Sequence, residues 1–330
     1  MEEIAVSVVC LVYNHEKYLR KCLEGFVNQK TNFKFEVLIH DDASTDNSAD
    51  IIREYETKYP DIIKPIYQTE NQYSKKLPGG ITGNFLIPRA KGKYIAFCEG
   101  DDYWCDEYKL QKQYDVMESN PNCHFCVHKV CAIKENGESL NQYYPKFALD
   151  TGAIKTERFM EILGIAYSFQ TSSYFIRTAD MKEYVNNPPE FVKAADVGDE
   201  PLMLYFGLLG DVYYIDEIMS CYRKSSVGSW SSRMKSDSKK WLAHCNSMVK
   251  MYDAFNELTS YKYEKQLLPR RKEYYLSKCA LDLDKRENAK VLLKKENRDF
   301  LKRYSIKNRV YIVLKAYAPK IVDFYYRINK

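Results

Sequence analysis

Three carboxylates stand within four positions of the stretch FCEGDDYW, at Glu99, Asp101 and Asp102. This stretch follows directly on a short apolar run, residues 94–97. Carboxylates packed so closely raise one another's pKa and weaken the local fold. Two interpretations are open at this point. The stretch is either an ordinary acidic turn or a site for a positive group, most simply a divalent cation with oxygen ligands.

A second acidic pair, Asp41 and Asp42, ends the apolar run of FEVLIHDDAS. Runs typical of buried strands occur at residues 4–13, 35–44, 62–68 and 92–104, and helical patterns at 14–29, 44–60 and 107–121. This alternation predicts a parallel sheet with crossover helices. Ligands of such sheets bind beyond the carboxyl ends of the strands. Both acidic clusters lie at such ends, which favours a functional site. Asn14 is predicted to cap the first helix.

Phosphate-binding loops are missing from the sequence. No GxGxxG follows the first predicted strand, and no GxxxxGK[ST] occurs anywhere. If the ligand carries phosphates, a metal held by carboxylates must neutralise them.

The composition is that of a soluble globular protein, with 330 residues, 45% hydrophobic and 29% charged. No run approaches the roughly 18–20 apolar residues that span a bilayer, and the N-terminus does not read as a secretory signal. Ten cysteines without an export signal predict reduced thiols and a cytoplasmic location. Cys123 and Cys126 have the CxxC spacing of a zinc site. The alternating pattern around them favours a core strand instead.

The charge is unevenly distributed along the chain. Residues 1–234 carry 26 Lys and Arg against 34 Asp and Glu, whereas residues 235–330 carry 24 against 11. The first segment is therefore acidic, with a net charge of −8, and the second basic, with +13. This asymmetry predicts two regions with different tasks, or one task performed at an anionic surface.

Four motifs together resemble family 2 glycosyltransferases of the GT-A fold. They are VSVVCLVYNHEKYL, LIHDDASTDNS, KGKYIAFCEGDDYW and GDEPLMLYFGLLGDVYYIDEIMSCYR, in the family's order and over about residues 4–232. The resemblance implies an α/β fold with a single Rossmann-like, mostly parallel sheet flanked by helices. Residues 1–234 would form the transferase domain, with a nucleotide-binding half at 1–105 and an acceptor half at 106–234. Residues 235–330 would be a basic, helical C-terminal extension.

The resemblance assigns nucleotide contacts to the first three motifs. Leu11 through its backbone, Tyr13 and Asp42 would hold the base and ribose. Glu99-Gly100-Asp101 stands where the family has DxD, with Glu in place of the first Asp. Asp101 would bind Mn²⁺ or Mg²⁺ together with the donor's diphosphate. Glu99, being longer than Asp, would contact ribose or reach the metal through water.

The fourth motif implies a general base, since an inverting transferase must remove the proton of the acceptor hydroxyl. Asp199 in VGDEPL matches that position, while Asp196 and Glu200 stand close enough to be alternatives. Asp199 could also be only a helix N-cap. Contacts to the acceptor or to phosphate are expected from a further set of residues: Asp102, Gln170, Thr171, Arg223 and Lys224. Ser225 departs from the family, where His is common.

The implied activity is a metal-dependent, inverting sugar transfer. The donor would be a nucleotide-diphosphate sugar, UDP-linked by preference, and the acceptor a hydroxyl of a glycan or lipid-linked glycan, as in assembly of bacterial surface polysaccharide. The enzyme class would be hexosyl- or N-acetylhexosaminyl-transferase. The alternative is a non-catalytic protein of the same fold that binds nucleotide sugars or acts as a scaffold.

The C-terminal segment, residues 304–330, reads as a basic amphipathic helix. Its apolar positions 306, 310, 313/314, 317, 321, 324/325 and 328 form one stripe, and Pro319 should break or kink the helix. Such a helix can lie on the inner face of the cell membrane, cover the catalytic domain or bind a partner protein. No nucleic-acid partner is expected, and the sequence leaves the oligomeric state open.

Overall fold

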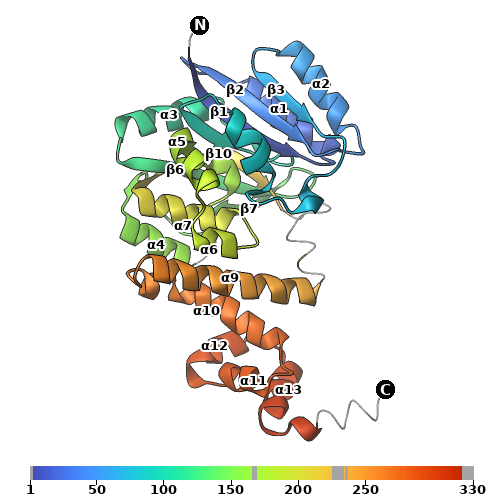
Figure 1. Cartoon of the computed structure of the whole chain (residues 1–330), viewed down its shortest axis with the longest axis vertical. Helices are drawn as coiled ribbons and strands as arrows, with labels where there is room; N and C mark the ends of the chain where they lie inside the picture. Colours follow the sequence, from blue (N-terminus) through green and yellow to red (C-terminus); the bar gives the residue numbers. More distant parts are fainter. Residues whose placement is uncertain (1–2, 166–168, 225–233, 235–236, 322–330) are drawn as a thin grey trace.

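The computed structural model describes residues 3–165, 169–224, 234 and 237–321. Figure 1 shows a main body built on one sheet with helices on both faces, and a smaller helical region that extends away from it along the long axis. The N-terminus lies at the end of the main body that is remote from this helical region.

The strands of the sheet follow the order β3-β2-β1-β4-β9-β6-β10-β5, with β7 paired to β6 and β8 to β10. The pairs β3-β2, β2-β1 and β1-β4 are parallel, and β10 is parallel to β6. Strands β5, β7, β8 and β9 pair antiparallel. The strand bounds are β1 Ile4–Val12, β2 Lys34–Asp41, β3 Ile63–Tyr67, β4 Tyr94–Phe97, β5 Tyr103–Trp104, β6 Cys123–Ile133, β7 Ser139–Tyr144, β8 Gly152–Ile154, β9 Phe175–Arg177 and β10 Asp211–Arg223.

The helices pack on both faces of this sheet and continue into the C-terminal region (Figure 1). Their bounds are α1 Glu16–Val27, α2 Ser48–Lys58, α3 Lys109–Ser119, α4 Thr156–Ile165, α5 Thr178–Asn186, α6 Glu190–Ala194, α7 Asp199–Leu209, α9 Ser238–Leu258, α10 Glu264–Leu281, α11 Arg286–Leu292, α12 Arg298–Leu301 and α13 Ile306–Tyr317. Short helical turns lie at Tyr73–Lys75, Thr82–Leu86, Ile87–Arg89, Thr171–Ser173 and Lys295–Asn297.

The apolar run of β1 explains why two cores form. Val6, Val8, Cys10 and Val12 are buried in the core beneath α1 and α2, whereas Val9 belongs to the core on the other face. A strand buried on both faces must be apolar at nearly every position. The strands expected at residues 4–13, 35–44 and 62–68 are confirmed, as are the helices expected at 14–29, 44–60 and 107–121. The strand expected at 92–104 is instead divided into β4 and β5 by a loop at 98–102.

Two local predictions had different outcomes. The first helix begins at Glu16, and Asn14 does not cap it, so that prediction was wrong. Asn14 instead has a left-handed φ of 57°, and its side-chain oxygen accepts a hydrogen bond from Thr45 N at 2.8 Å. The core-strand interpretation of the CxxC segment is confirmed, because Cys123 and Cys126 lie in β6 and are almost completely buried.

The apolar core divides inside α10 rather than at residue 234. Residues of α9 such as Met248 and Phe255 belong to the same core as α4 and α7, and Leu267 of α10 lies there too. A separate, smaller core begins at Leu276 and joins the end of α10 to α11, α12 and α13. The first part of the basic region is therefore built into the main body, as Figure 1 shows for α9.

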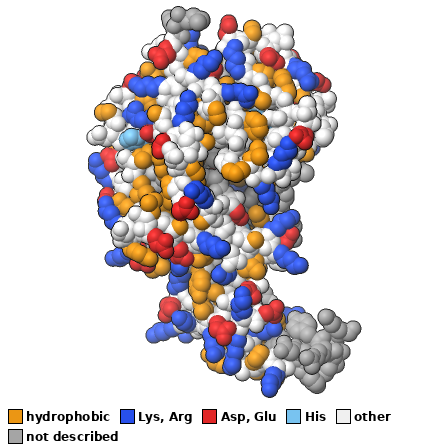
Figure 2. Space-filling view, viewed as in Figure 1, with side chains coloured by type: hydrophobic (Ala, Val, Ile, Leu, Met, Phe, Trp, Pro, Cys, Tyr) orange, Lys and Arg blue, Asp and Glu red, His pale blue; other side chains and the backbone are white. Residues whose placement is uncertain are grey.

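Helix α13 packs on the small core through Ile312 and Ala316, not through the stripe expected from the sequence. The helix ends at Tyr317, before Pro319, as predicted. The stripe remains outward, with exposed side chains at Ile306, Val310, Val313, Tyr317 and Ile321. Figure 2 shows Lys and Arg side chains beside apolar ones on this narrow end of the molecule. The rest of the predicted helix, residues 322–330, lies outside the described residues. Within the described part of the chain, no helix is long and apolar enough to cross a membrane.

Candidate active site

The carboxyl ends of β2, β1 and β4 lie side by side, because these three strands are parallel neighbours. Two backbone hydrogen bonds tie the acidic segments to the end of β1. Asp42 N donates to Val12 O at 2.9 Å, and Gly100 N donates to Leu11 O at 3.0 Å. The two acidic clusters therefore flank one strand end, where Tyr13 is 46% exposed.

Asp42 is buried, and its carboxylate accepts three hydrogen bonds from the loop that follows β3. It accepts hydrogen bonds from Gln72 N at 2.7 Å, Tyr73 N at 3.0 Å and the side-chain amide of Asn71 at 2.8 Å. Charge-assisted hydrogen bonds of this kind stabilise a buried carboxylate. Asp42 thus fixes the loop at residues 71–73 beside the end of β2.

The loop between β4 and β5 approaches β1 so closely that it needs a glycine. A Cβ atom on Gly100 would lie 2.8 Å from His15 Nδ1 and 3.3 Å from Leu11 O. The first of these separations is shorter than real Cβ atoms adopt, so a side chain here would push the loop away from β1. Glycine therefore allows Glu99 and Asp101 to stand at the rim of the sheet.

The carboxylate of Asp102 in this loop has few hydrogen-bond donors in the part of the chain that is described. Asp102 is 2% exposed, and its Oδ1 accepts from Arg223 N at 2.8 Å. Among the described residues, the buried Oδ2 of Asp102 has no hydrogen-bond partner. Burial, and then the charge of Asp101, raise the pKa of Asp102 well above its ordinary value. Without a cation nearby, Asp102 therefore favours its protonated, neutral form.

The pKa of Glu99 is also raised, by burial and by neighbouring carboxylates. Desolvation by the surrounding protein, followed by the charges of Asp101 and Asp199, raises the pKa of Glu99 to about 8. The side chain is nevertheless exposed to solvent. The carboxylate of Glu99 therefore has protein near it and solvent on one side. The charge of Asp199, the first residue of α7, also acts on Glu99.

Arg223 is hydrogen-bonded to the backbone of the acidic loop. It is 5% exposed, and its Nε donates to Asp101 O at 2.9 Å. Its Nη1 donates to the carbonyls of Lys134 and Glu135 at 3.1 and 2.6 Å, and the guanidinium lies 4.3 Å from the centre of the Tyr18 ring. These contacts give Arg223 a structural role, and none of them supports the phosphate contact expected from the sequence. Its neighbour Lys224 donates to Gln142 Oε1 at 2.7 Å.

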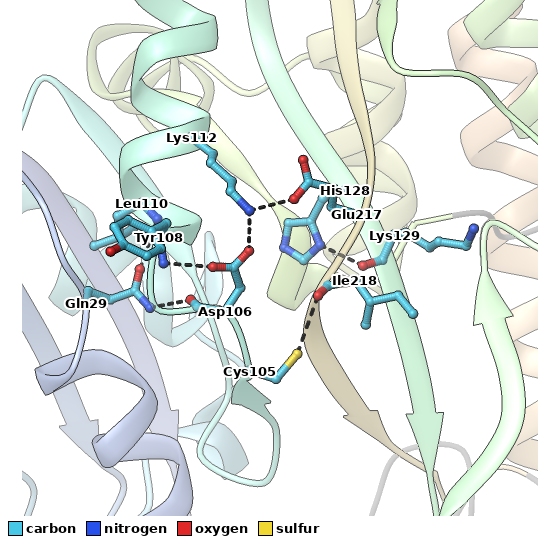
Figure 3. Close-up of polar contacts among 10 residues, drawn as sticks. All are labelled: Gln29, Cys105, Asp106, Tyr108, Leu110, Lys112, His128, Lys129, Glu217 and Ile218. Atoms are coloured by element: carbon cyan, nitrogen blue, oxygen red, sulfur yellow. Dashed lines mark hydrogen bonds and ion pairs between the residues drawn. The ribbon is translucent and has the colours of Figure 1, made fainter.

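The end of the acidic loop is anchored as well. Lys112 donates to Asp106 at 2.6 Å and to Glu217 at 2.5 Å, and the thiol of Cys105 donates to Ile218 O at 3.6 Å. Figure 3 shows these contacts joining the segment after β5 to α3 and β10. Together with Arg223, they hold the C-terminal part of the loop and the segment after β5.

Asp199 is the first residue of α7, and Gly198 rather than Asp199 occupies the N-cap position. Its Oδ1 accepts a hydrogen bond from Glu200 N at 2.8 Å. A carboxylate in the first turn is stabilised by the helix dipole. The two alternatives for the base are engaged elsewhere: Asp196 accepts from His244 Nδ1 at 2.7 Å, and Glu200 is buried in an ion pair with Arg270.

The segment around Gln170 and Thr171 lies beside the acidic loop. Trp104, which is 3% exposed, donates its indole N–H to Ser172 O at 3.2 Å. Phe97 N donates to Tyr174 O, also at 3.2 Å. Gln170 itself is buried, whereas Thr171 is partly exposed. The structure therefore brings this segment to the rim, next to the residues expected to bind the donor.

A divalent cation fits this site only together with a ligand. Among the residues that the structure describes, no group of three or more His, Cys, Asp or Glu side chains could hold a metal ion by itself. A bound cation would favour the ionised forms of Glu99 and Asp102, whose pKa values are raised in its absence. Mg²⁺ in particular is commonly held by one or two carboxylates plus substrate phosphates and water. The donor set thus fits a metal that binds with a diphosphate.

Several residues that build the site were missed in the sequence. They are the donors at 71–73, the supporting role of Arg223, and the partners of Glu200 on the C-terminal helices. The sequence indicates these residues only indirectly, because a buried carboxylate needs hydrogen-bond donors but the sequence does not say which residues supply them. Which residues supply those donors depends on chain segments that are 30 to 121 positions away.

The sequence is similar to that of known proteins. The family model described as Glycosyl transferase family 2 matches residues 7–177. An uncharacterized protein of Mycobacterium tuberculosis (strain ATCC 25618 / H37Rv) is 31% identical over 268 residues, which are 80% of this chain and 71% of that protein.

Two solved structures are similar in fold. TarS of S. aureus, residues 1–349 in complex with UDP, has a TM-score of 0.52 at 17% identity, covering 94% of this chain and 90% of that chain. The mannosyltransferase PcManGT from Pyrobaculum calidifontis, in complex with GDP-Man and Mn²⁺, has a TM-score of 0.50 at 14% identity, covering 95% and 86%. At these identities the likeness shows the fold alone.

Proposed function

The chain belongs to glycosyl transferase family 2 and has the GT-A fold, and on this premise we propose that it transfers a sugar from a nucleotide-diphosphate sugar to a hydroxyl group of a glycan, with inversion. A UDP-linked donor is the first choice, because TarS binds UDP on a similar fold. The transferred sugar would be a hexose or an N-acetylhexosamine.

One observation carries this proposal. The charge of Asp199 contributes to the raised pKa of Glu99, so the carboxylate at the start of α7 interacts electrostatically with the acidic loop after β4. An inverting transferase needs this arrangement, with a diphosphate-binding group on one side of the anomeric carbon and a proton acceptor on the other. The sequence resemblance assigns the base to the position of Asp199, and Asp196 and Glu200 are bound to His244 and Arg270.

The remaining residues would bind and orient the donor. Tyr13 offers an exposed ring on which a base can stack, and Asp42 stands beside it on the same rim. Asp101 would hold Mn²⁺ or Mg²⁺, and when bound the cation would neutralise charge on the departing diphosphate. Asp199 would take the proton of the acceptor hydroxyl while the oxygen forms its bond to the sugar and the bond to the diphosphate breaks.

A donor screen with the full chain tests this function. Release of free nucleotide from UDP-, GDP- and TDP-sugars in the presence of Mn²⁺ should identify at least one donor. Asp199→Asn should lower the rate roughly 10²–10⁴-fold without changing UDP affinity, because it removes only the proton acceptor. UDP binding without turnover of any donor would indicate a non-catalytic nucleotide-sugar-binding protein. A comparable loss in Asp196→Asn, with Asp199→Asn active, would transfer the base role to Asp196.

We also propose that the acceptor is lipid-linked and that the α13 end of the molecule binds an anionic membrane surface. Five basic residues and no acidic one occur at positions 303–321, and the apolar side chains of Ile306, Val310 and Val313 are exposed there. A basic, partly apolar helix face binds anionic lipid by both charge and apolar contact. This end lies far from β1–β3, so binding would leave the rim of the sheet open (Figure 1).

Vesicle co-sedimentation tests the membrane proposal. The full chain should bind vesicles that contain phosphatidylglycerol at low salt and dissociate at 1 M salt, where the Debye length is about 3 Å. Val310→Asp should weaken binding several-fold without unfolding, because the side chain is already exposed. Leu258→Asp, at an exposed position of α9, is the matched control. Equal binding of the two variants, or no binding by the wild type, would reject the proposal.

A further inference from the structure

Glu200 is a buried charge with an unusually complete set of donors. It is 5% exposed, and its Oε1 accepts from Arg270 Nε at 3.1 Å and from the hydroxyl of Tyr252. Its Oε2 accepts from Arg270 Nη2 at 3.2 Å and from the hydroxyl of Tyr274 at 2.8 Å. A buried carboxylate is costly unless its lone pairs are satisfied in this way.

All four donors come from the C-terminal helices. Glu200 belongs to the first turn of α7, whereas Tyr252 lies on α9, and Arg270 and Tyr274 lie on α10. Burial, and then the charge of Glu200, raise the pKa of both tyrosines well above the ordinary value. The two hydroxyls therefore keep their protons and remain donors at any physiological pH.

The same helices hold the chain just before α7. His244 of α9 is 2% exposed and contacts Asp196 Oδ1 through Nδ1 at 2.7 Å. Ser247, one turn further along α9, donates to Ala194 O at 2.7 Å. Residues 194–200 are thus held at Ala194, at Asp196 and at Glu200, and Asp199 lies between the last two of these points.

A short chain of contacts leads from Arg270 to the proposed base. Arg270 fixes the carboxylate of Glu200, and the backbone N–H of Glu200 donates to Asp199 Oδ1 at 2.8 Å. If Glu200 shifts, the donor that orients Asp199 shifts with it. The loop that bears Glu99 and Asp101 has its own anchor in Arg223, so nucleotide binding does not depend on this chain of contacts.

We infer that α9 and α10 act as a brace for the catalytic carboxylate, and that Arg270 is a positioning residue that sets the orientation of Asp199 through Glu200. This inference rests on the proposed role of Asp199 as the base. It gives the first part of the basic C-terminal region a task in the reaction itself, separate from the membrane contact proposed for α13.

Arg270→Met tests the brace, with Arg271→Met as the matched control. Arg271 is the next residue of α10, but its Nε pairs with Asp253 Oδ1 at 2.6 Å between partly exposed side chains. Arg270→Met should lower kcat roughly 10- to 10²-fold, the size of effect expected from a small misplacement of a catalytic group. UDP affinity should change less than about twofold, and Arg271→Met should leave both quantities near wild type. Arg270→Lys should restore part of kcat, since it returns the positive charge.

The pH profile distinguishes positioning from general stability. Without Arg270, Glu200 would bind a proton more readily, and the neutral acid can stay buried. The kcat deficit of Arg270→Met should therefore grow as the pH rises from about 5 to 8. A deficit that is constant with pH, or a loss of UDP affinity equal to the loss of kcat, would overturn the inference.

Hydrogen exchange supplies a readout that does not require activity. Amides of residues 194–200 should exchange faster in Arg270→Met than in Arg271→Met, with the loop at 98–102 unchanged in both. If the wild type transfers no sugar from any donor, the proposed function fails while this measurement still decides whether the brace exists. Equal exchange in the two variants would rule the brace out.

Discussion

The strands β2 and β4 flank β1, and the carboxylates that follow them, Asp42 and Asp102, differ in how their oxygens are hydrogen-bonded. Asp42, at the end of β2, receives three hydrogen bonds from residues 71–73. Glu99 and Asp102, after β4, have raised pKa values, and the buried Oδ2 of Asp102 lacks a partner among the described residues. All three are carboxylates in segments that follow parallel strands, and the segments that pack against them differ.

The comparison separates two tasks for carboxylates in this site. A carboxylate whose charge is balanced by backbone donors is rigid and can offer its remaining lone pairs to a neutral partner such as a nucleobase N–H. A cluster that lacks such donors favours a positive ligand, because binding a cation removes the repulsion between its members. We therefore expect substitutions in the acidic loop to change metal dependence, and substitutions of Asp42 to change nucleotide affinity alone.

The largest effect is expected from Asp101→Ala. Loss of this carboxylate should abolish the enhancement of UDP affinity by Mn²⁺ and lower the transfer rate by at least about 10²-fold, since charge on the departing diphosphate is no longer neutralised. Calorimetric titration of UDP with and without Mn²⁺ measures the first effect. Asp115→Ala, an exposed carboxylate on α3, is the control. Wild-type UDP binding that is indifferent to Mn²⁺ would contradict the assignment of the acidic loop.

The sequence predicted the rim itself because local patterns determine it. Apolar runs at residues 4–13 and 35–44 give buried strands, and the residues that end them must lie at one edge of a parallel sheet. The pairs at 41–42 and 101–102 could therefore be placed before the structure was known. The helical nature of residues 238–317 was equally predictable from composition and periodicity.

Predictions failed where distant segments decide the outcome. Asn14 was expected to cap α1, but Thr45 from the next crossover draws its side chain into another contact. The phosphate contact expected of Arg223 stays a prediction, but the sequence did not show that the carbonyls of Lys134 and Glu135 hold its guanidinium. The stripe of α13 has helical spacing, and periodicity alone does not tell which face meets a core supplied by α10 and α11. In each case the partner is far away along the chain.

A smaller effect is expected from Asp42→Asn. The amide keeps one acceptor oxygen but loses the charge and one acceptor position, so the loop at 71–73 should loosen. Since a typical hydrogen bond contributes about 0.5–1.5 kcal/mol, UDP affinity should fall roughly 3- to 10-fold. The enhancement by Mn²⁺ should persist, and Asn71→Ala, which removes only one of the three donors, should have a weaker effect. Loss of the Mn²⁺ response in Asp42→Asn would contradict the hypothesis that Asp42 affects nucleotide affinity alone and that the acidic loop determines metal dependence.

The smallest effect concerns stability and pH in the acidic loop. The pKa of Glu99 is raised from 4.5 to about 8 in the folded protein. Between these values the folded state retains a proton that the unfolded state has released, so the contribution of Glu99 to stability falls as the pH rises through this range. Glu99 is exposed, so solvent screening reduces the effect, and we expect a decrease in Tm of about 2–4 °C between pH 6 and pH 8.5 in EDTA.

Glu99→Gln should flatten this dependence of Tm on pH. Mn²⁺ with UDP should also flatten it, because a bound cation favours the ionised carboxylates. If Tm depended more steeply on pH with Mn²⁺ and UDP than with EDTA, a bound cation would not be what favours the ionised carboxylates of this loop.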